Sequence, residues 1–75
     1  MKKRVYIETT VVSYLTARKS GNPVVAGHQE SMRMFWERLP RFAPFVSDLV
    51  LQEVGRGHPM QAKARLDALI NVPML

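Results

Sequence analysis

The sequence predicts an α/β fold with a parallel sheet, in the element order strand, two helices, strand, two helices, strand. Two observations lead to this prediction. Short runs of β-forming residues occur three times along the chain, and two stretches with helical spacing of apolar residues separate each run from the next. Such an alternation is typical of a parallel sheet whose strands are joined by right-handed crossovers.

The first predicted strand covers residues 5–7 and ends abruptly at an acid, Glu8. Thr9 or Thr10 can cap the helix that follows, which runs to about Ala17. In an open parallel sheet, ligands gather at the carboxyl ends of the strands. Glu8 therefore occupies a position suited to a functional site.

The second helix has the clearest boundaries. A polar stretch over residues 18–22 stops the first helix, Asn22 is a good cap, and Pro23 suits the first helical position. Apolar spacing then continues until Pro40. We expect one face to be apolar, with Val25, His28, Met32, Phe35 or Trp36, and Leu39. The opposite face is expected to be solvated and carries Gln29, Glu30, Arg33, Glu37 and Arg38.

The second half repeats the pattern. Residues 42–46 form the second predicted strand, Ser47 caps the next helix, and Asp48 lies in its first turn, where a negative charge suits the helix dipole. That helix continues through Val54 and stops at residues 55–57.

The last predicted helix begins at Pro59 and is broken by Asn71. Residues 72–75 are predicted to open a third strand. One face of this helix is expected to be apolar, with Ala62, Leu66, Leu69 and Ile70.

Composition narrows the class of protein. Eleven Lys and Arg against six Asp and Glu give a formal charge of +5, which favours polyanions such as nucleic acid, although solubility alone explains the excess equally well. The chain has no cysteine, so it forms neither disulfides nor thiolate metal sites. We expect a soluble, cytoplasmic protein, because no apolar run resembles a signal segment or a membrane span.

Two segments carry a resemblance to a known family. Residues 6–15, YIETTVVSYL, are similar to the first strand and helix of PIN-domain nucleases: a hydrophobic strand, an acid, small hydroxyl residues and then aliphatics. Residues 47–57, SDLVLQEVGRG, resemble the second signature of that family, a helix with an acid followed by Arg-Gly. The order and separation of the two segments also fit, and the likeness is greatest to VapC-type toxins of bacterial toxin–antitoxin pairs.

This resemblance implies a fold and an activity. The fold is a three-layer α/β/α arrangement, of which residues 1–75 would be the N-terminal portion of a single domain, truncated after the third strand. The activity is a metal-dependent endoribonuclease that uses Mg²⁺ or Mn²⁺, with RNA as substrate and a cognate antitoxin as partner. Carboxylates suit this chemistry because these hard ions prefer oxygen ligands and retain waters that can attack phosphorus.

Residue by residue, Glu8 matches the first acid of the family and Glu53 the second, so both are expected to bind metal and act in catalysis. Thr9 and Thr10 match the small hydroxyl positions beside the first acid and are expected either to support the metal-binding acids or to contact substrate phosphate. The family ordinarily has Asp where this chain has Glu8, which sets the carboxylate one methylene further out. The remaining family acids would lie beyond Leu75, so we expect this 75-residue chain to be a weak or inactive nuclease.

Other interpretations of the same residues remain open. Glu8 could form a surface ion pair, and Glu53 could belong to the polar face of its helix. Asp48 is more simply a residue that complements the helix dipole, and Asp67 a solvated residue. His28 is expected to be a core or rim histidine on the apolar side of its helix, and His58 has no partner at metal-ligand spacing.

A different class of function is also open. The chain could be a non-catalytic interaction module with an unpaired sheet edge, which dimerises, self-associates or binds an antitoxin.

Overall fold

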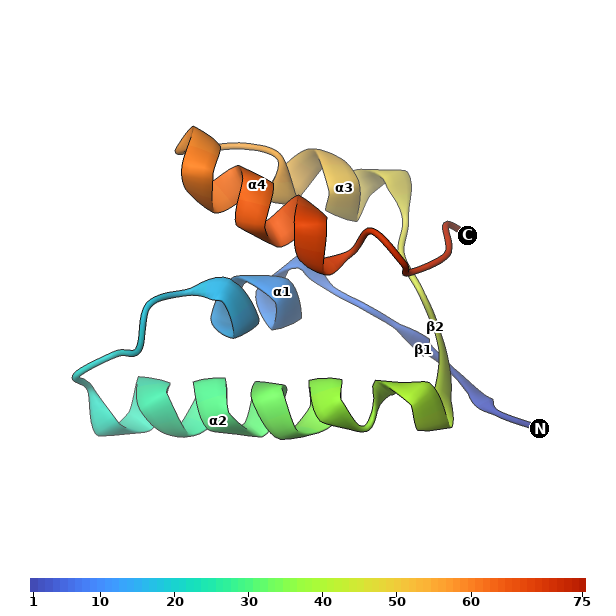
Figure 1. Cartoon of the computed structure of the whole chain (residues 1–75), viewed down its shortest axis with the longest axis horizontal. Coiled ribbons are helices and arrows are strands. Elements are labelled where there is room, and N and C mark those ends of the chain that lie inside the picture. Colours follow the sequence, from blue (N-terminus) through green and yellow to red (C-terminus); the bar gives the residue numbers. More distant parts are fainter.

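The computed structural model describes all 75 residues, with four α-helices and a two-stranded parallel sheet. The strands β1 (Lys3–Tyr6) and β2 (Phe42–Phe45) pair in register, with Lys3 opposite Phe42 and Tyr6 opposite Phe45. The helices are α1 (Thr9–Thr16), α2 (Pro23–Glu37), α3 (Asp48–Val54) and α4 (Pro59–Ala68), with a short 3₁₀ turn at Leu39–Arg41. Figure 1 shows α2 on one side of the molecule, α3 and α4 on the other, and α1 between them.

The predicted α/β class and parallel pairing are confirmed, but the prediction of three strands is wrong. Only one residue of the expected third strand, Met74, pairs with the sheet, through an isolated parallel bridge to Val46. The Pro73 carbonyl accepts a hydrogen bond from the Val46 N–H at 2.9 Å, and the Leu75 N–H donates one to the Val46 carbonyl at 2.8 Å.

Two prolines explain why this pairing stops at one bridge. Backbone groups point alternately to the two edges of a strand, and Phe45 bonds to β1, so Pro44 and Val46 face the opposite edge. Pro44 has no N–H to offer to a third strand, and neither has Pro73. The same geometry explains why Pro44 is tolerated in β2, since its missing N–H is not needed by β1.

The helix ends follow local chemistry. The side-chain oxygen of Asn22 accepts from the N–H groups of Val24 and Val25, at 2.9 and 3.3 Å, ahead of the predicted Pro23. Ser47 caps α3 as expected, with its hydroxyl accepting from the Val50 N–H at 3.3 Å. For α1, however, Glu8 occupies the cap position in place of a threonine, and its side chain makes no capping hydrogen bond.

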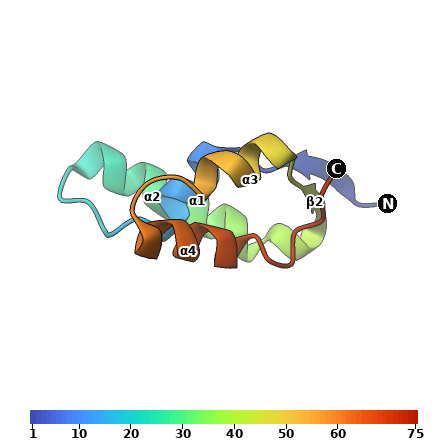
Figure 2. The same ribbon diagram turned by 90° about the horizontal axis from the view of Figure 1, so that it is seen from above.

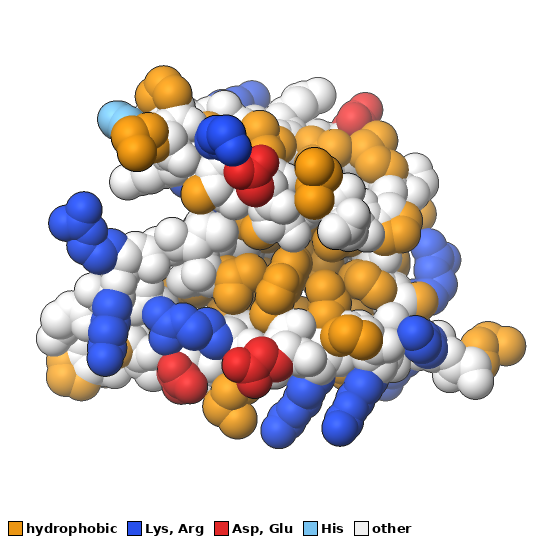
Figure 3. Space-filling view, viewed as in Figure 1, with side chains coloured by type: hydrophobic (Ala, Val, Ile, Leu, Met, Phe, Trp, Pro, Cys, Tyr) orange, Lys and Arg blue, Asp and Glu red, His pale blue; other side chains and the backbone are white.

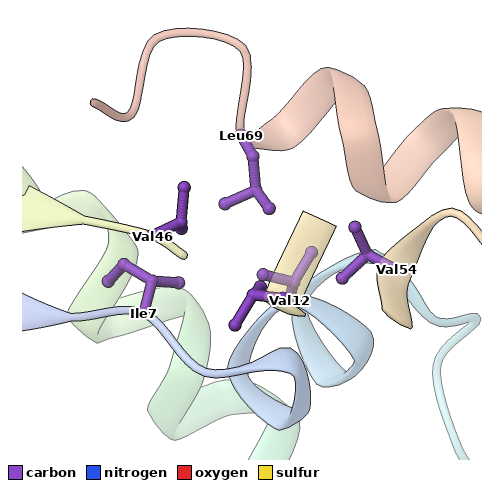
Figure 4. Packing of buried hydrophobic residues seen from close by; sticks show 6 residues of the cluster. Ile7, Val12, Val46, Val54 and Leu69 are labelled. Atoms are coloured by element: carbon purple, nitrogen blue, oxygen red, sulfur yellow. The ribbon is translucent and has the colours of Figure 1, made fainter. Parts of the chain in front are cut away.

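The core is small and lies where β1, β2, α1, α3 and the end of α4 meet (Figures 2 and 4). Its six clustered residues are Ile7, Val12, Val46, Val50, Val54 and Leu69. Eight of the 75 residues are buried, so a large share of the apolar side chains is only partly covered. Figure 3 shows apolar side chains at the surface between α2 and α4.

Two sequence-based expectations about helix faces are wrong. Gln29, expected on the solvated face of α2, is 1% exposed, whereas His28, expected on the apolar face, is exposed and stacks on Tyr14 at 5.8 Å between ring centroids. On α4 the expected apolar face is only partly buried, because Leu66 and Ile70 are exposed. Gln29 is buried because the segment between α1 and α2 folds over its side chain, which is a tertiary contact that helical spacing does not reveal.

Candidate functional site

The candidate site lies where β1 ends and α1 begins. The parallel ladder extends one residue past β1, through a hydrogen bond of 2.9 Å from the Ile7 N–H to the Phe45 carbonyl. Ile7 is fully buried, and Glu8 follows in extended conformation, with φ −85° and ψ 159°. The chain therefore changes direction at Glu8, at the carboxyl end of the sheet, as the sequence predicts.

One hydrogen bond joins the two sequence segments that carry the motif. The Thr9 hydroxyl donates to Oε1 of Glu53 at 2.9 Å. These residues lie at the start of α1 and in the last turn of α3, and the contact brings them together from positions 44 residues apart. The two segments therefore meet at one place on the molecule.

Glu8 lies next to this contact along the chain. Its Cα is about 3.8 Å from that of Thr9, as in any trans peptide. The side chain is exposed, and it stands at the N-terminal end of α1, where the helix dipole favours a negative charge. The Glu8 carboxylate is therefore accessible to a ligand in solvent.

Glu53 is in the opposite electrostatic position. It lies in the last turn of α3, where the helix dipole disfavours a carboxylate. The Thr9 hydroxyl compensates for part of this cost by donating to one oxygen, and it also fixes the orientation of the carboxylate. The second oxygen, Oε2, makes no hydrogen bond within the protein and remains available to a ligand.

Thr10 is exposed on the first turn of α1, and its side chain makes no hydrogen bond. Its expected contact with substrate stays a prediction. Asp48 is exposed in the first turn of α3, where it complements the helix dipole.

A second polar contact, which the sequence analysis missed, fixes the other end of α3. The Tyr6 and Ser47 hydroxyls lie 2.7 Å apart, so the last residue of β1 contacts the residue that caps α3. A tyrosine at the end of a strand gives no sequence signal for such a partner. Together with the bond to Glu53, this contact fixes both ends of α3 relative to the junction of β1 and α1.

The donor set at this junction consists of oxygen atoms, which are the ligands that Mg²⁺ and Mn²⁺ prefer. Glu53 supplies a carboxylate in contact with the Thr9 hydroxyl, and Glu8, the residue before Thr9, supplies a second carboxylate that is exposed to solvent. Nowhere in the chain do three or more His, Cys, Asp or Glu side chains come together in a group that could hold a metal ion. Two carboxylates are fewer than the ligands that a hard divalent ion requires for a complete coordination shell.

Three titratable residues of α4 and its cap have structural partners. His58 caps α4, with Nδ1 accepting from the Met60 N–H at 3.2 Å. Asp67 accepts from Lys63 at 2.7 Å, and this hydrogen bond, with the attraction between the two charges, raises the pKa of Lys63 above its ordinary value of 10.5.

Comparisons with protein-family models, curated proteins and solved structures found no match to this chain. None of the helices has the length and apolar character that a bilayer span requires.

Proposed function

We propose that this chain is a PIN-like, metal-dependent endoribonuclease, the toxin of a type II toxin–antitoxin pair. The observation that carries the proposal is the hydrogen bond between Thr9 and Glu53. It joins the two segments on which the resemblance rests, at the end of the sheet where ligands collect in parallel α/β folds.

In this proposal, Glu8 and Glu53 hold Mg²⁺ or Mn²⁺ through their accessible carboxylate oxygens. The ion supplies Lewis acidity toward a phosphodiester and lowers the pKa of a bound water. Thr9 orients Glu53, and Thr10 contacts a phosphate of the RNA. Because two carboxylates are few for a hard divalent ion, we propose that this 75-residue chain binds the ion weakly and cleaves RNA slowly.

The test of Glu8 and Glu53 measures both RNA cleavage and metal binding, so that the site can be assessed even if cleavage is slow. The first is cleavage of single-stranded RNA in Mg²⁺ or Mn²⁺ by the wild-type chain, by Glu8→Gln and by Glu53→Gln. The second is broadening of backbone NMR signals by Mn²⁺, which is paramagnetic and reports binding without turnover. Glu37→Gln, at an exposed acid on α2, is the matched control for the loss of one carboxylate.

We expect Mn²⁺ to broaden signals around residues 8–10 and 53 in the wild type, and each site substitution to remove both this broadening and any cleavage. Glu37→Gln should behave as the wild type. Broadening that is unchanged in Glu8→Gln and Glu53→Gln would refute the assignment of the site.

A second candidate is a non-catalytic module that binds another copy of itself or an antitoxin. The observation in its favour is that β1 pairs on one side only. Because the Ile7 N–H points to β2, the N–H groups of Arg4 and Tyr6 point to the free edge. An exposed apolar hollow also lies beside β2, lined by Trp36, Leu39, Pro40, Phe42 and Pro44.

Sedimentation velocity tests this alternative. Arg4→Pro removes an N–H from the free edge and leaves the bonds to β2 intact, and Arg4→Gln is the control for the lost charge and for the lost packing of the guanidinium on Phe45. If the edge mediates self-association, Arg4→Pro is monomeric where Arg4→Gln still dimerises. A wild type that stays monomeric over the concentration range would rule out self-association.

A further inference from the structure

The largest cavity of the molecule lies away from the candidate acids, at the other end of α1. Its volume is about 460 Å³, and it opens between the end of α1 and one side of α4. Figure 3 shows a recess in this region, on the left, below the start of α4. We call it the arginine cleft, and its lining residues are Ser13, Thr16, Ala17, Arg18, Gln61 and Arg65.

The lining has the chemistry of an anion site. Two of the six residues are arginines, three others carry hydroxyl or amide groups, and only Ala17 is apolar. No carboxylate lines the cleft. The first turn of α4 borders the cleft through Gln61, and the last turn of α1 borders it through Ser13 and Thr16. The positive end of one helix dipole and the negative end of the other therefore oppose each other, and the positive charge of the cleft comes from its two guanidinium groups.

Arg65 is held in place before any ligand arrives. Its Nε donates to the Val54 carbonyl at 2.8 Å, and Nη2 donates to the Arg56 carbonyl at 2.6 Å. A guanidinium has five N–H groups, so three remain for a ligand. Because both acceptors are backbone atoms at the end of α3, the side chain loses little further freedom on binding.

Arg18 stands on an anchored segment, although its own side chain is exposed. The buried Gln29 donates from Nε2 to the Arg18 carbonyl and accepts from the Ser20 N–H, both at 3.0 Å. These two bonds fix the backbone between α1 and α2. They therefore fix the backbone of Arg18, which lines the cleft together with Arg65.

We propose that the arginine cleft binds a phosphodiester group of single-stranded RNA. Guanidinium groups match phosphate geometry, and the polar lining offers little apolar contact to an acidic peptide. The eight residues of α1 separate the cleft from Glu8 by about 12 Å, a distance that a short RNA strand can span. This inference rests on the proposed function for the identity of the ligand, but it involves neither the acids nor the metal.

The test measures binding of a fluorescent oligouridine by anisotropy in EDTA, over a series of salt concentrations. Without divalent metal no cleavage interferes, so the result is independent of the test of Glu8 and Glu53. Arg18→Gln removes one guanidinium, and its matched control is Arg41→Gln, an exposed arginine far from the cleft. Gln61→Glu puts a carboxylate into the cleft, and its control is Asn71→Asp. Glutamate suits the first turn of a helix, so Gln61→Glu is expected to fold.

We expect Arg18→Gln and Gln61→Glu each to raise the Kd for RNA about tenfold, as for the loss of a charge-assisted hydrogen bond. For Arg18→Gln the slope of log Kd against log salt should fall by about 0.7, the value for one phosphate of a single strand. Both controls should differ little from the wild type. Equal affinities for each variant and its control would overturn the proposal. It would also be overturned if polyglutamate displaced the RNA as effectively as unlabelled oligouridine. The same holds if inorganic phosphate bound the cleft but the affinity for RNA did not depend on Arg18.

Discussion

Gln29 provides the sharpest test of how this small molecule is held together. Its side chain is 1% exposed and makes one hydrogen bond to the Arg18 carbonyl and one to the Ser20 N–H. Gln29→Met keeps the length of the side chain but removes both bonds. At about 1 kcal/mol for each neutral hydrogen bond, we expect the free energy of unfolding to fall by about 2 kcal/mol. For a chain of this size, that corresponds to a fall in Tm of about 8 to 16 °C.

The assay is urea unfolding followed by far-ultraviolet circular dichroism, with the slope m compared between variants to check that the same surface is exposed on unfolding. Gln52→Met is the matched control, because Gln52 is exposed on α3, and its effect should stay within about 0.5 kcal/mol. If the two variants lost the same stability, the buried amide would not be holding the segment between α1 and α2, and our explanation for its burial would be wrong.

Three further predictions follow from contacts of the site and of α4. Thr9→Val removes the hydroxyl that orients the carboxylate of α3, so we expect weaker Mn²⁺ binding by NMR, and unchanged binding would show that this hydrogen bond is dispensable. Ser47→Ala should lower the free energy of unfolding by about 1 kcal/mol through loss of the α3 cap, and Tyr6→Phe, which spares the cap, should cost less in the same urea assay. Asp67→Asn should lower the pKa of Lys63 toward 10.5 in an NMR titration, and a pKa that the substitution leaves unchanged would show that Asp67 does not cause the shift. Because the pKa of Lys63 is raised on folding, this pair contributes stability below pH 10.5 and loses it as the pH rises through the folded-state pKa.

Local signals in the sequence predicted the starts of α2 and α3 well, whereas α2 ends at Glu37, before the expected stop at Pro40. The start of α2 depends on Asn22 and Pro23, and the start of α3 on Ser47, all of which act on backbone groups within three residues. Such chemistry is complete within a short window of sequence. The fold class could be predicted for a similar reason, because strands and helices differ in the spacing of their apolar residues.

Features that depend on distant parts of the chain could not be predicted. Helical spacing places Gln29 beside charged residues, and only the folded segment over residues 18–20 buries it. The predicted third strand does not form because Pro44 and Pro73, from different parts of the chain, both lack an N–H at the edge where it would pair. For the candidate site, the sequence identified Glu8 and Glu53 as residues to consider, but not the hydrogen bond from Thr9.

The arginine cleft gave no signal in the sequence at all. Arg18 and Arg65 lie far apart along the chain, and the basic residues show no cluster beyond Lys2, Lys3 and Arg4. Charge counting alone could indicate an affinity for polyanions, but it could not locate the surface.

The parallel pairing of β1 with β2 also bears on how the chain folds. Every backbone bond of this sheet joins the first residues of the chain to residues beyond position 41, across the whole of α1 and α2. Closing so long a loop costs entropy before the first strand bond repays it. Helices can form from neighbouring residues alone, so we expect the sheet to assemble after them and the closing of this loop to limit the refolding rate.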